Sequence, residues 1–297
     1  MLLATPILSM TSHSTPGLRD YAALTKPRIT WLILMSTAIG CIFGQRPDFG
    51  WIAFLHTLAG TGLLASGTAA LNQWYEWDAD ALMKRTRNRP IPSGRMPRAH
   101  ALWFGAALAL AGFLELALGV NLLSASLGLF TLASYLLLYT PLKRRSPHST
   151  TVGAIPGALP PMIGYAAAQG HLSAEAWALF AILFLWQFPH FYSIAWMYRE
   201  DYGNAGIRML PVVEPDGAST ARHILFTSLL LIPVSLAPTY LGMTGKLYLY
   251  GALAAGTMFF YASYRVASEK TVARARKVLL ASVVYLPVLY GLMLIDR

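Results

Sequence analysis

Residues 72–95 combine carboxylates, an amide and basic side chains in a way that could bind a metal ion. Asn72, Glu76 and Asp80 follow one another at intervals of four residues at the end of an apolar run. On a helix, this spacing places the three side chains on one face, as a polar stripe that drifts slowly around the axis. Their oxygens are the hard ligands that suit Mg²⁺, an ion that proteins often share with substrate phosphates. The acids alone nevertheless favour a simpler interpretation, a solvated helix end whose carboxylates pair with Lys84 and Arg85.

The basic side chains around this stripe favour chemistry on a diphosphate. The cations closest in sequence or expected on the same side of the molecule are Lys84, Arg85, Arg89, Arg95, Lys143 and Arg144. A metal ion neutralises some oxygens of a diphosphate, and arginine binds others in bidentate fashion. A diphosphate that leaves an allylic chain with this help produces a carbocation, and stabilisation of the departing charge is then the main catalytic effect.

The elements that position these residues are predicted to be membrane-spanning helices. Of the 297 residues, 56% are hydrophobic and only 12% are charged, whereas a soluble domain has about 25% charged residues. The sequence predicts an all-α membrane protein with nine transmembrane helices in a bundle, each of a length that can cross a bilayer. The nine predicted segments are 29–45, 51–75, 101–120, 122–140, 152–168, 176–198, 224–243, 247–264 and 278–295.

The placement of charge predicts how the bundle is oriented. With these segments, 20 of the 23 Lys and Arg residues fall on one side, and only Arg46, Lys246 and Arg297 fall on the other. The bias predicts a cytoplasmic N-terminus and cytoplasmic acidic motifs, with the C-terminus outside. We therefore interpret the net charge of +10 as topology and expect no nucleic-acid partner. The expected location is the cell inner membrane, with the lipid bilayer as the surrounding medium.

The domain prediction is a single polytopic unit, residues 21–297, after a short flexible arm of residues 1–20. Seven of the 13 acidic residues lie in two loops, one after segment 51–75 and one after segment 176–198. Because these segments are four apart in the series, the chain is suggestive of two four-helix repeats, about 27–145 and 146–266, plus a ninth helix.

Several motifs in order resemble one known family. Asn72-x₃-Glu76-x₃-Asp80, followed by ArgProIlePro at 89–92, resembles the first acidic motif of the UbiA superfamily of intramembrane prenyltransferases. Six further motifs of this chain resemble those of the heme branch of that superfamily. They are MKRTRNRP at 83–90, YTPLKR at 139–144, GAIPGALPP at 153–161, WQFPHF at 186–191, DY at 201–202 and MLPVV at 209–213. The resemblance extends from about residue 20 to residue 295.

The resemblance implies a nine-helix bundle around a central cavity and a prenyl transfer that uses Mg²⁺ held by two acidic motifs. It implies farnesyl diphosphate and heme b as substrates, heme O as product, and a downstream heme A synthase as a partner. The residues that it implies for the metal and catalysis are Asn72, Glu76, Asp80 and Asp201, and those for the diphosphate are Arg85, Arg89, Lys143 and Arg144.

The second acidic motif departs from the general pattern of the superfamily, which has two acids four residues apart. Tyr198 and Tyr202 occupy those two positions, with Glu200 and Asp201 between them. The departure resembles the heme branch and puts the second set of metal ligands in doubt, although Asp201 is the expected ligand.

Two polar residues in a predicted span are expected, from the resemblance, to contact heme. His190 and Gln187 lie towards the cytoplasmic end of segment 176–198, where polar side chains are costly in hydrocarbon. His190 could ligate the iron or bind a propionate, and a packed, hydrogen-bonded histidine is the alternative. Glu115, inside segment 101–120, has no assigned role and is interpreted as a hydrogen-bonded acid.

Two other functions are alternatives to prenyl transfer to heme. A related enzyme would prenylate an aromatic quinone or a chlorophyll precursor, which the two tyrosines and the WQFPHF segment argue against. A transporter or assembly factor would place ionisable residues near the bilayer centre. In this sequence the acids instead cluster at helix ends, which favours an enzyme acting on a charged head group.

Overall fold

The computed structural model describes residues 16–297, which contain helices and loops but no strand. Of the predicted arm, residues 1–20, the first 15 residues lie outside the described part of the chain. Residues 18–20 belong to the first helix. The helices are α1 (Leu18–Leu24), α2 (Pro27–Phe43), α3 (Trp51–Tyr75), α4 (Trp77–Leu82), α5 (Arg98–Gly119), α6 (Leu122–Ala133), the π-helix η1 (Ser134–Tyr139), α7 (Thr140–Leu142), α8 (Ser149–Gly157), α9 (Pro160–Gln169), α10 (Ala174–Met197), α11 (Arg199–Asn204), α12 (Leu210–Val213), α13 (Ala218–Tyr240), α14 (Lys246–Ser268) and α15 (Val272–Ile295).

The long helices confirm a multi-pass membrane protein. Within residues 16–297, six helical stretches are long and apolar enough to cross a membrane: α3, α5, residues 122–142, α10, α13 and α15. Many large apolar side chains on these helices face outwards, among them Trp103, Leu118 and Ile295. Such a surface is stable in contact with lipid rather than water.

The other three predicted spans are helical but differ from a simple long span. α2 is shorter, at 17 residues, and α14 is long enough but is not one of the six. The predicted segment 152–168 is divided into α8 and α9, of nine and ten residues. The division falls next to Pro156, Pro160 and Pro161, because proline lacks the N–H that continues a helix and clashes with the preceding turn.

Glycines set the closest helix crossings of the bundle. A Cβ atom added to Gly40 of α2 would lie 1.9 Å from the carbonyl oxygen of Pro161 in α9, and one added to Gly164 would lie 1.9 Å from that of Thr37. α3 and α5 approach in the same way at Gly67 and Gly112. Small residues let helix backbones pack closely in a membrane, where lipid tails give no hydrophobic driving force for association.

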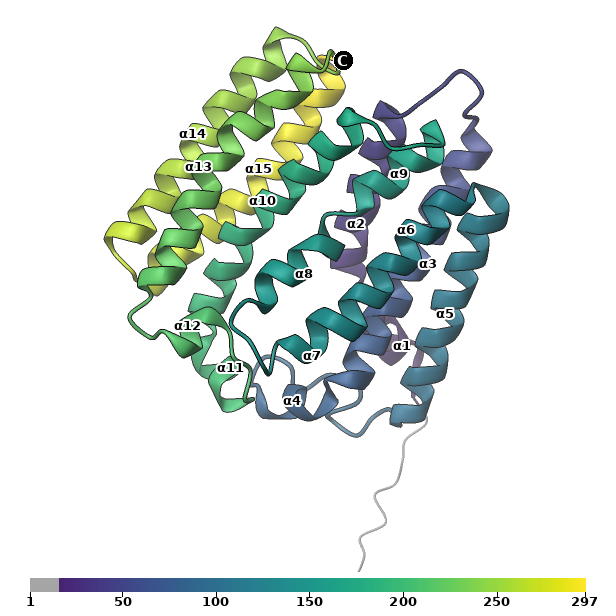
Figure 1. Ribbon diagram of the computed structural model, residues 1–297. Helices are drawn as coiled ribbons and strands as arrows, with labels where there is room; N and C mark the ends of the chain where they lie inside the picture. Colours follow the sequence, from purple (N-terminus) through teal and green to yellow (C-terminus); the bar gives the residue numbers. More distant parts are fainter. Residues whose placement is uncertain (1–15) are drawn as a thin grey trace, which may run out of the picture.

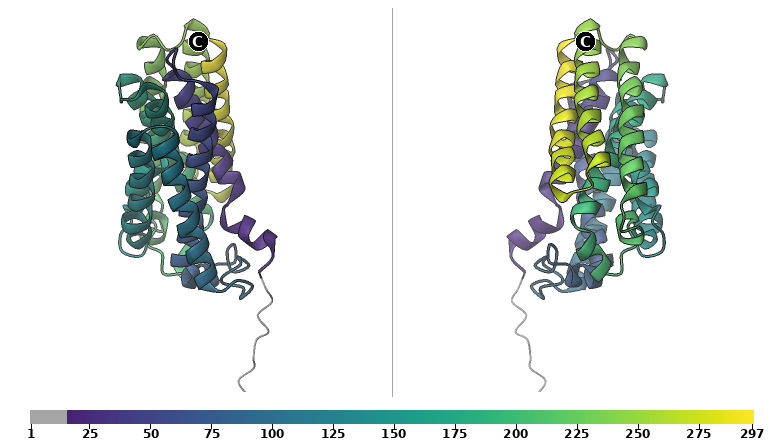
Figure 2. Two further views of the ribbon diagram at one scale, coloured as in Figure 1. Left: turned by 90° about the vertical axis from the view of Figure 1, so that its right-hand side faces the viewer. Right: turned by 90° about the vertical axis from the view of Figure 1, so that its left-hand side faces the viewer.

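The short helices gather at one end of the bundle. Figures 1 and 2 show α1, α4, α7, α11 and α12 at the end where the described chain begins, and the C-terminus at the opposite end. This is the end that carries both acidic segments and most of the basic residues. The fold therefore brings together, on one face of the bundle, the polar residues that the sequence placed in separate loops.

A candidate diphosphate site at the acidic end of the bundle

The predicted polar stripe is present and is mostly buried. Glu76 lies at the bend between α3 and α4, and the backbone bonds Glu76 N–H to Asn72 O and Asp80 N–H to Glu76 O, both 2.9 Å, carry the helical pattern across it. Asn72, Glu76 and Asp80 are 2%, 9% and 1% exposed. The Asn72 Nδ2 amide donates to Glu76 Oε2 at 2.8 Å. The stripe is thus a preorganised cluster of oxygens rather than a solvated helix end.

Each acid of this segment binds a cation, either from later in the segment or from the loop after α7. Lys143 Nζ lies 2.9 Å from both carboxylate oxygens of Glu76, and Arg89 Nη1 lies 2.6 Å from Asp80 Oδ2. Burial raises the pKa of Glu76, but Lys143, together with Asn72 and Lys26, outweighs burial and leaves that pKa below its usual value. The simpler interpretation, in which Lys84 and Arg85 pair with the acids, is therefore wrong: Arg85 instead donates to the Tyr202 hydroxyl at 3.4 Å.

Lys26 is a third cation at this cluster. Its Nζ donates to Asn72 Oδ1 at 3.2 Å, and among residues 16–297 it is the one non-glycine residue with positive φ, at 47°. Such backbone is costly and persists where the surrounding structure requires it. Burial, followed by the charges of Arg89 and Lys143, lowers the pKa of Lys26 to about 7.

A π-helix delivers Lys143 to the cluster. In η1 the chain makes one wider turn, and Thr140 Oγ1 donates to the Tyr135 carbonyl five residues earlier at 2.8 Å. π-turns of this kind often occur at functional sites. The Lys143 ammonium lies 4.6 Å from the centroid of the Tyr139 ring, a cation–π distance. Gly153 of α8 leaves room for this ring, since an added Cβ there would lie 2.5 Å from it.

The second acidic segment packs against the first through apolar side chains. Tyr202 of α11 and Met209 are buried together with Ala79 and Met83 of the first segment. The guanidinium of Arg85 lies over the rings of Tyr198 and Tyr202, at 5.5 and 5.9 Å. The backbone N–H of Arg208 donates to the Lys143 carbonyl at 2.8 Å, which joins the loops that follow α7 and α11. Tyr198 and Tyr202, which stand at the two acid positions of the second motif, thus hold the two segments together.

The oxygen donors of the first segment have the chemistry of a magnesium site. Asn72, Glu76 and Asp80 supply an amide and two carboxylates, hard ligands for a small divalent cation. Asp201 of α11 is partly exposed and makes no ion pair with residues 16–297. Within the same residues, no group of three or more His, Cys, Asp or Glu side chains is arranged to hold a metal ion. The fit therefore rests on the first segment.

The two residues expected to contact heme face different neighbours. Gln187 Nε2 donates to the carbonyls of Ala154 and Leu183, at 3.1 and 3.2 Å, and so links α10 to α8. The His190 ring stacks on Trp186 with 4.8 Å between centroids, and its Nδ1 lies 2.8 Å from Ser282 Oγ of α15. The two side chains therefore contact different helices, α8 for Gln187 and α15 for His190.

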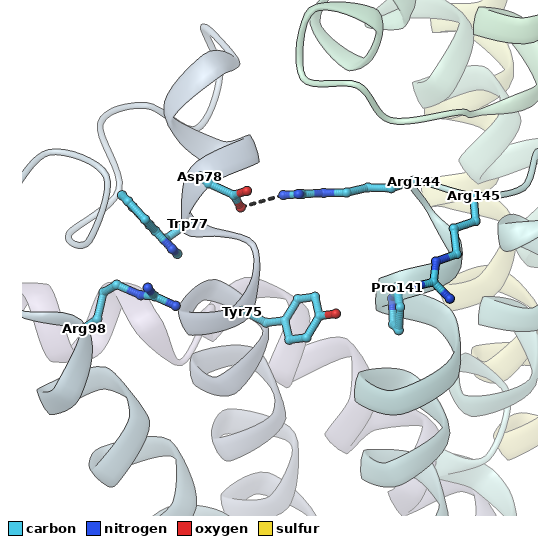
Figure 3. Close-up of a pocket in the computed structure, with 7 residues that line it drawn as sticks. All are labelled: Tyr75, Trp77, Asp78, Arg98, Pro141, Arg144 and Arg145. Atoms are coloured by element: carbon cyan, nitrogen blue, oxygen red, sulfur yellow. Dashed lines mark hydrogen bonds and ion pairs between the residues drawn. The ribbon is translucent and has the colours of Figure 1, made fainter.

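Two further acids have partners outside the cluster. Asp78 lies on the outer side of α4, where Arg144 Nη2 contacts its Oδ1 at 2.5 Å, and the two residues line an open pocket (Figure 3). Arg144 is thus directed away from Glu76 although it follows Lys143 in the chain. Glu115 in α5 lies 2.6 Å from His56 Nδ1 of α3, so it is a hydrogen-bonded acid, as expected.

The sequence missed Lys26 as a member of the site. Lys26 is one of the 20 basic residues that the charge bias places on the cytoplasmic side, and its only local signal is the following Pro27, which starts α2 directly after it. Gln73 fixes this junction by donating to the carbonyls of Ala23 and Leu24, at 3.3 and 3.0 Å. A contact between residues 46 positions apart leaves no pattern in a single sequence.

The sequence pattern of the UbiA prenyltransferase family matches residues 33–284 of the chain. A protein of Solibacter usitatus (strain Ellin6076) named "Protoheme IX farnesyltransferase" is 65% identical over 289 residues, which cover 94% of this chain and 99% of that protein.

Solved structures resemble the fold over nearly its whole length. Digeranylgeranylglyceryl phosphate synthase superposes with a TM-score of 0.78 at 17% identity, covering 94% of this chain and 98% of that one. A UbiA homolog from Archaeoglobus fulgidus bound to GPP and Mg²⁺ gives a TM-score of 0.65 at 15% identity, covering 92% of this chain and 99% of that one. At such identities, the likeness establishes the fold.

Proposed function

The chain belongs to the UbiA prenyltransferase family, and we propose that it transfers a farnesyl group from farnesyl diphosphate to a vinyl group of heme b, with addition of water, to give heme O. The observation that carries the proposal is the buried cluster in which the cations Lys26, Arg89 and Lys143 surround only two carboxylates, Glu76 and Asp80. The cluster has more basic groups than carboxylates, and an anionic ligand would stabilise the charged form of Lys26 away from water. The 65% identical relative supports farnesyl diphosphate and heme b as the substrates.

The cluster would bind the diphosphate and assist its departure. Arg89, Lys143 and Lys26 are held around Asn72, Glu76 and Asp80, from where their N–H groups can turn to phosphate oxygens. These donors stabilise the negative charge that develops as the C1–oxygen bond of the farnesyl chain breaks. The terminal vinyl carbon of heme then bonds to C1, and water adds to the resulting cation with loss of a proton. No side-chain nucleophile is needed.

Mg²⁺ is the proposed cofactor, with Asn72, Glu76 and Asp80 as its ligands and Asp201 as the donor from the second segment. When bound, the ion neutralises diphosphate oxygens and so makes the leaving group a weaker base. The Archaeoglobus fulgidus homolog bound to GPP and Mg²⁺ supports this assignment. Arg85, which lies over the rings of Tyr198 and Tyr202, is a further proposed diphosphate contact. Arg144 is also proposed as a contact, and it would have to leave Asp78 to reach the diphosphate.

The proposed heme contacts are His190 and Gln187. A hydrogen bond fixes the Nδ1 atom of His190, and another fixes the Nε2 amide of Gln187. The bond on Nδ1 would hold the other ring nitrogen of His190 in a defined direction. Replacing His190 by glutamine is expected to raise the KM for heme b and leave the KM for farnesyl diphosphate unchanged.

We propose nine spans in the cell inner membrane, with the acidic end of the bundle in the cytoplasm, the C-terminus outside and two four-helix repeats. The position of the described N-terminal residues and the C-terminus at opposite ends of the bundle supports an odd number of crossings (Figure 1). Heme O leaving the site would pass to a downstream heme A synthase in the same membrane.

The test incubates purified protein with heme b, farnesyl diphosphate and Mg²⁺ and measures heme O by mass. Wild type should form heme O, EDTA should abolish the product, and added Mg²⁺ should restore it. A parallel reaction offers an aromatic quinone precursor as acceptor. Prenylation of that acceptor in place of heme would assign the chain to another branch of the family and overturn the proposal.

A further inference from the structure

A pocket of about 410 Å³ lies on the outer side of the proposed diphosphate site, between the end of α3, α4, the start of α5 and the loop after α7 (Figure 3). Ligand sites commonly have volumes of about 300–1,000 Å³. Its lining includes three guanidinium groups, from Arg98, Arg144 and Arg145. Arg98 and Arg145 were explained by membrane topology alone, which requires basic residues at this end but does not require that they share a hollow.

The pocket carries more positive charge than its own acid neutralises. Asp78 is the one acidic residue in the lining, and it is paired with Arg144. Arg98 and Arg145 are exposed, and within residues 16–297 neither makes an ion pair. Two unpaired guanidinium groups at one hollow match a ligand with two carboxylates, since each guanidinium can bind a carboxylate with two parallel hydrogen bonds.

Aromatic rings form the other part of the lining. Tyr75 and Trp77 are 44% and 37% exposed, and the Arg98 guanidinium lies 4.8 Å from the Trp77 ring centroid. Flat, partly apolar walls beside cations favour a ligand that is itself flat and apolar with anionic groups at one edge. Heme b has this shape: its two propionates lie on one edge of the macrocycle, and its vinyl groups lie on the opposite side.

The pocket shares its walls with the diphosphate cluster. Asp78 follows Glu76 by two residues in α4, and Arg144 directly follows Lys143, whose ammonium binds Glu76 at 2.9 Å. The pocket and the cluster are therefore formed by the two faces of the same two chain segments. A ligand bound here would therefore lie beside the segments that hold the proposed diphosphate site.

We propose that this pocket binds the two propionates of heme b through Arg98 and Arg145, with Tyr75 and Trp77 against the macrocycle. The inference rests on the proposed function, because it assigns the site of its acceptor substrate. It also gives the two substrates separate sites, the buried cluster for the diphosphate and the outer pocket for the heme propionates. Of the two roles considered for His190, propionate binding passes to the pocket.

The test compares heme b with its dimethyl ester, in which both propionate charges are removed. Wild type, the double variant Arg98→Gln/Arg145→Gln and the control Arg276→Gln are reconstituted at full length in phosphatidylcholine nanodiscs. Arg276 is an exposed arginine in the first turns of α15. Binding is measured by the shift of the Soret band, and turnover by heme O formation.

The double variant should weaken heme b binding at least about tenfold, the scale expected when charged hydrogen bonds are lost. Its affinity for the dimethyl ester and its KM for farnesyl diphosphate should equal those of wild type, as should every value of the Arg276 control. The double variant Arg98→Lys/Arg145→Lys should recover part of the loss, because it restores charge without the bidentate geometry.

Equal weakening of both hemes, or unchanged binding of both, would overturn the inference. A loss that appears only when phosphatidylglycerol is included in the nanodiscs would assign the pocket to an anionic lipid head group instead. Failure of the proposed function would differ from failure of the pocket assignment. If the proposed function fails, wild type forms no heme O, but the preference for binding heme b over its ester still tests the pocket.

Discussion

The two acidic segments of this protein, residues 72–95 and 198–216, follow long apolar helices in the same way but are built from different forces. In the first, Glu76, Asp78 and Asp80 each bind a cation brought from elsewhere in the chain or from later in the segment. In the second, none of the four acids forms an ion pair within the described residues 16–297, and burial of Tyr202 and Met209 dominates.

The difference indicates that the two segments have different roles. The first segment concentrates buried charge, which is costly to fold and is retained where it serves chemistry. The second closes over it with apolar contacts, which set position without contributing charge. If the two acidic motifs formed a symmetric site, Asp80 and Asp201 would have similar environments. Asp80 is instead buried, whereas Asp201 is partly exposed.

Asp80→Asn should have the largest effect on activity. The substitution keeps the shape of the side chain but removes the charge that holds Arg89 at 2.6 Å and that would bind the metal. We expect heme O formation to fall by about 100- to 1,000-fold, the scale seen when one preorganised electrostatic group is removed from an active site. Turnover is measured by product mass, and folding by the thermal unfolding temperature.

Asp216→Asn is the matched control, because Asp216 is an exposed acid of the second segment. It should retain wild-type turnover. If Asp80→Asn were as active as this control, the buried cluster would have no part in the reaction.

Lys26→Gln should have the next largest effect and tests whether the first segment depends on cations from outside it. Loss of a charged hydrogen-bond donor typically weakens binding at least about tenfold, so the KM for farnesyl diphosphate should rise by this factor. The KM for heme b should not change. Arg28→Gln, at an exposed position two residues away, serves as the control. Equal effects of the two variants on the KM would remove Lys26 from the site.

Tyr202 separates packing from charge in the second segment. Tyr202→Ala should destabilise the fold by about 3 kcal/mol, the scale for removing a buried aromatic ring, because Tyr202 packs with Ala79 and Met83. Tyr202→Phe keeps the ring and loses only the 3.4 Å contact with Arg85, so its unfolding temperature and turnover should stay close to those of wild type. The pair of variants is compared by thermal unfolding in one detergent. A large loss in Tyr202→Phe would show that the hydroxyl, rather than the ring, is the essential group.

The sequence predicted what depends on local pattern and on the resemblance. Each of the nine apolar segments corresponds to a helix or a broken helix, and the spacing of Asn72, Glu76 and Asp80 predicted their shared face. The ordered motifs predicted the family, and the family match over residues 33–284 confirmed it.

The remaining features depend on contacts between distant residues. Many basic residues lie at the acidic end, and nothing local shows that Lys143, 67 positions from Glu76, is the one that binds it. The π-turn of η1, which sets the direction of Lys143, has no signature in the apolar run SYLLLY. The break between α8 and α9 was the most accessible of these features, since three prolines stand at it, but the hydropathy of 152–168 favoured one span.

Asp201→Asn should have the smallest effect among the proposed metal ligands, and it decides how far the comparison holds. Asp201 is partly exposed and has no cation partner within residues 16–297, so its loss disturbs no buried pair. We expect turnover to fall by about tenfold or less, against about 100-fold or more for Asp80→Asn. The Mg²⁺ concentration that gives half-maximal activity should rise, because a ligand of the bound ion is weakened. Glu200→Gln, at the adjacent exposed position, is the control. If Asp201→Asn were as inactive as Asp80→Asn, with unchanged thermal stability, the second segment would carry catalytic charge equal to the first. The apolar clamp formed by Tyr202 would then serve to hold that charge in place.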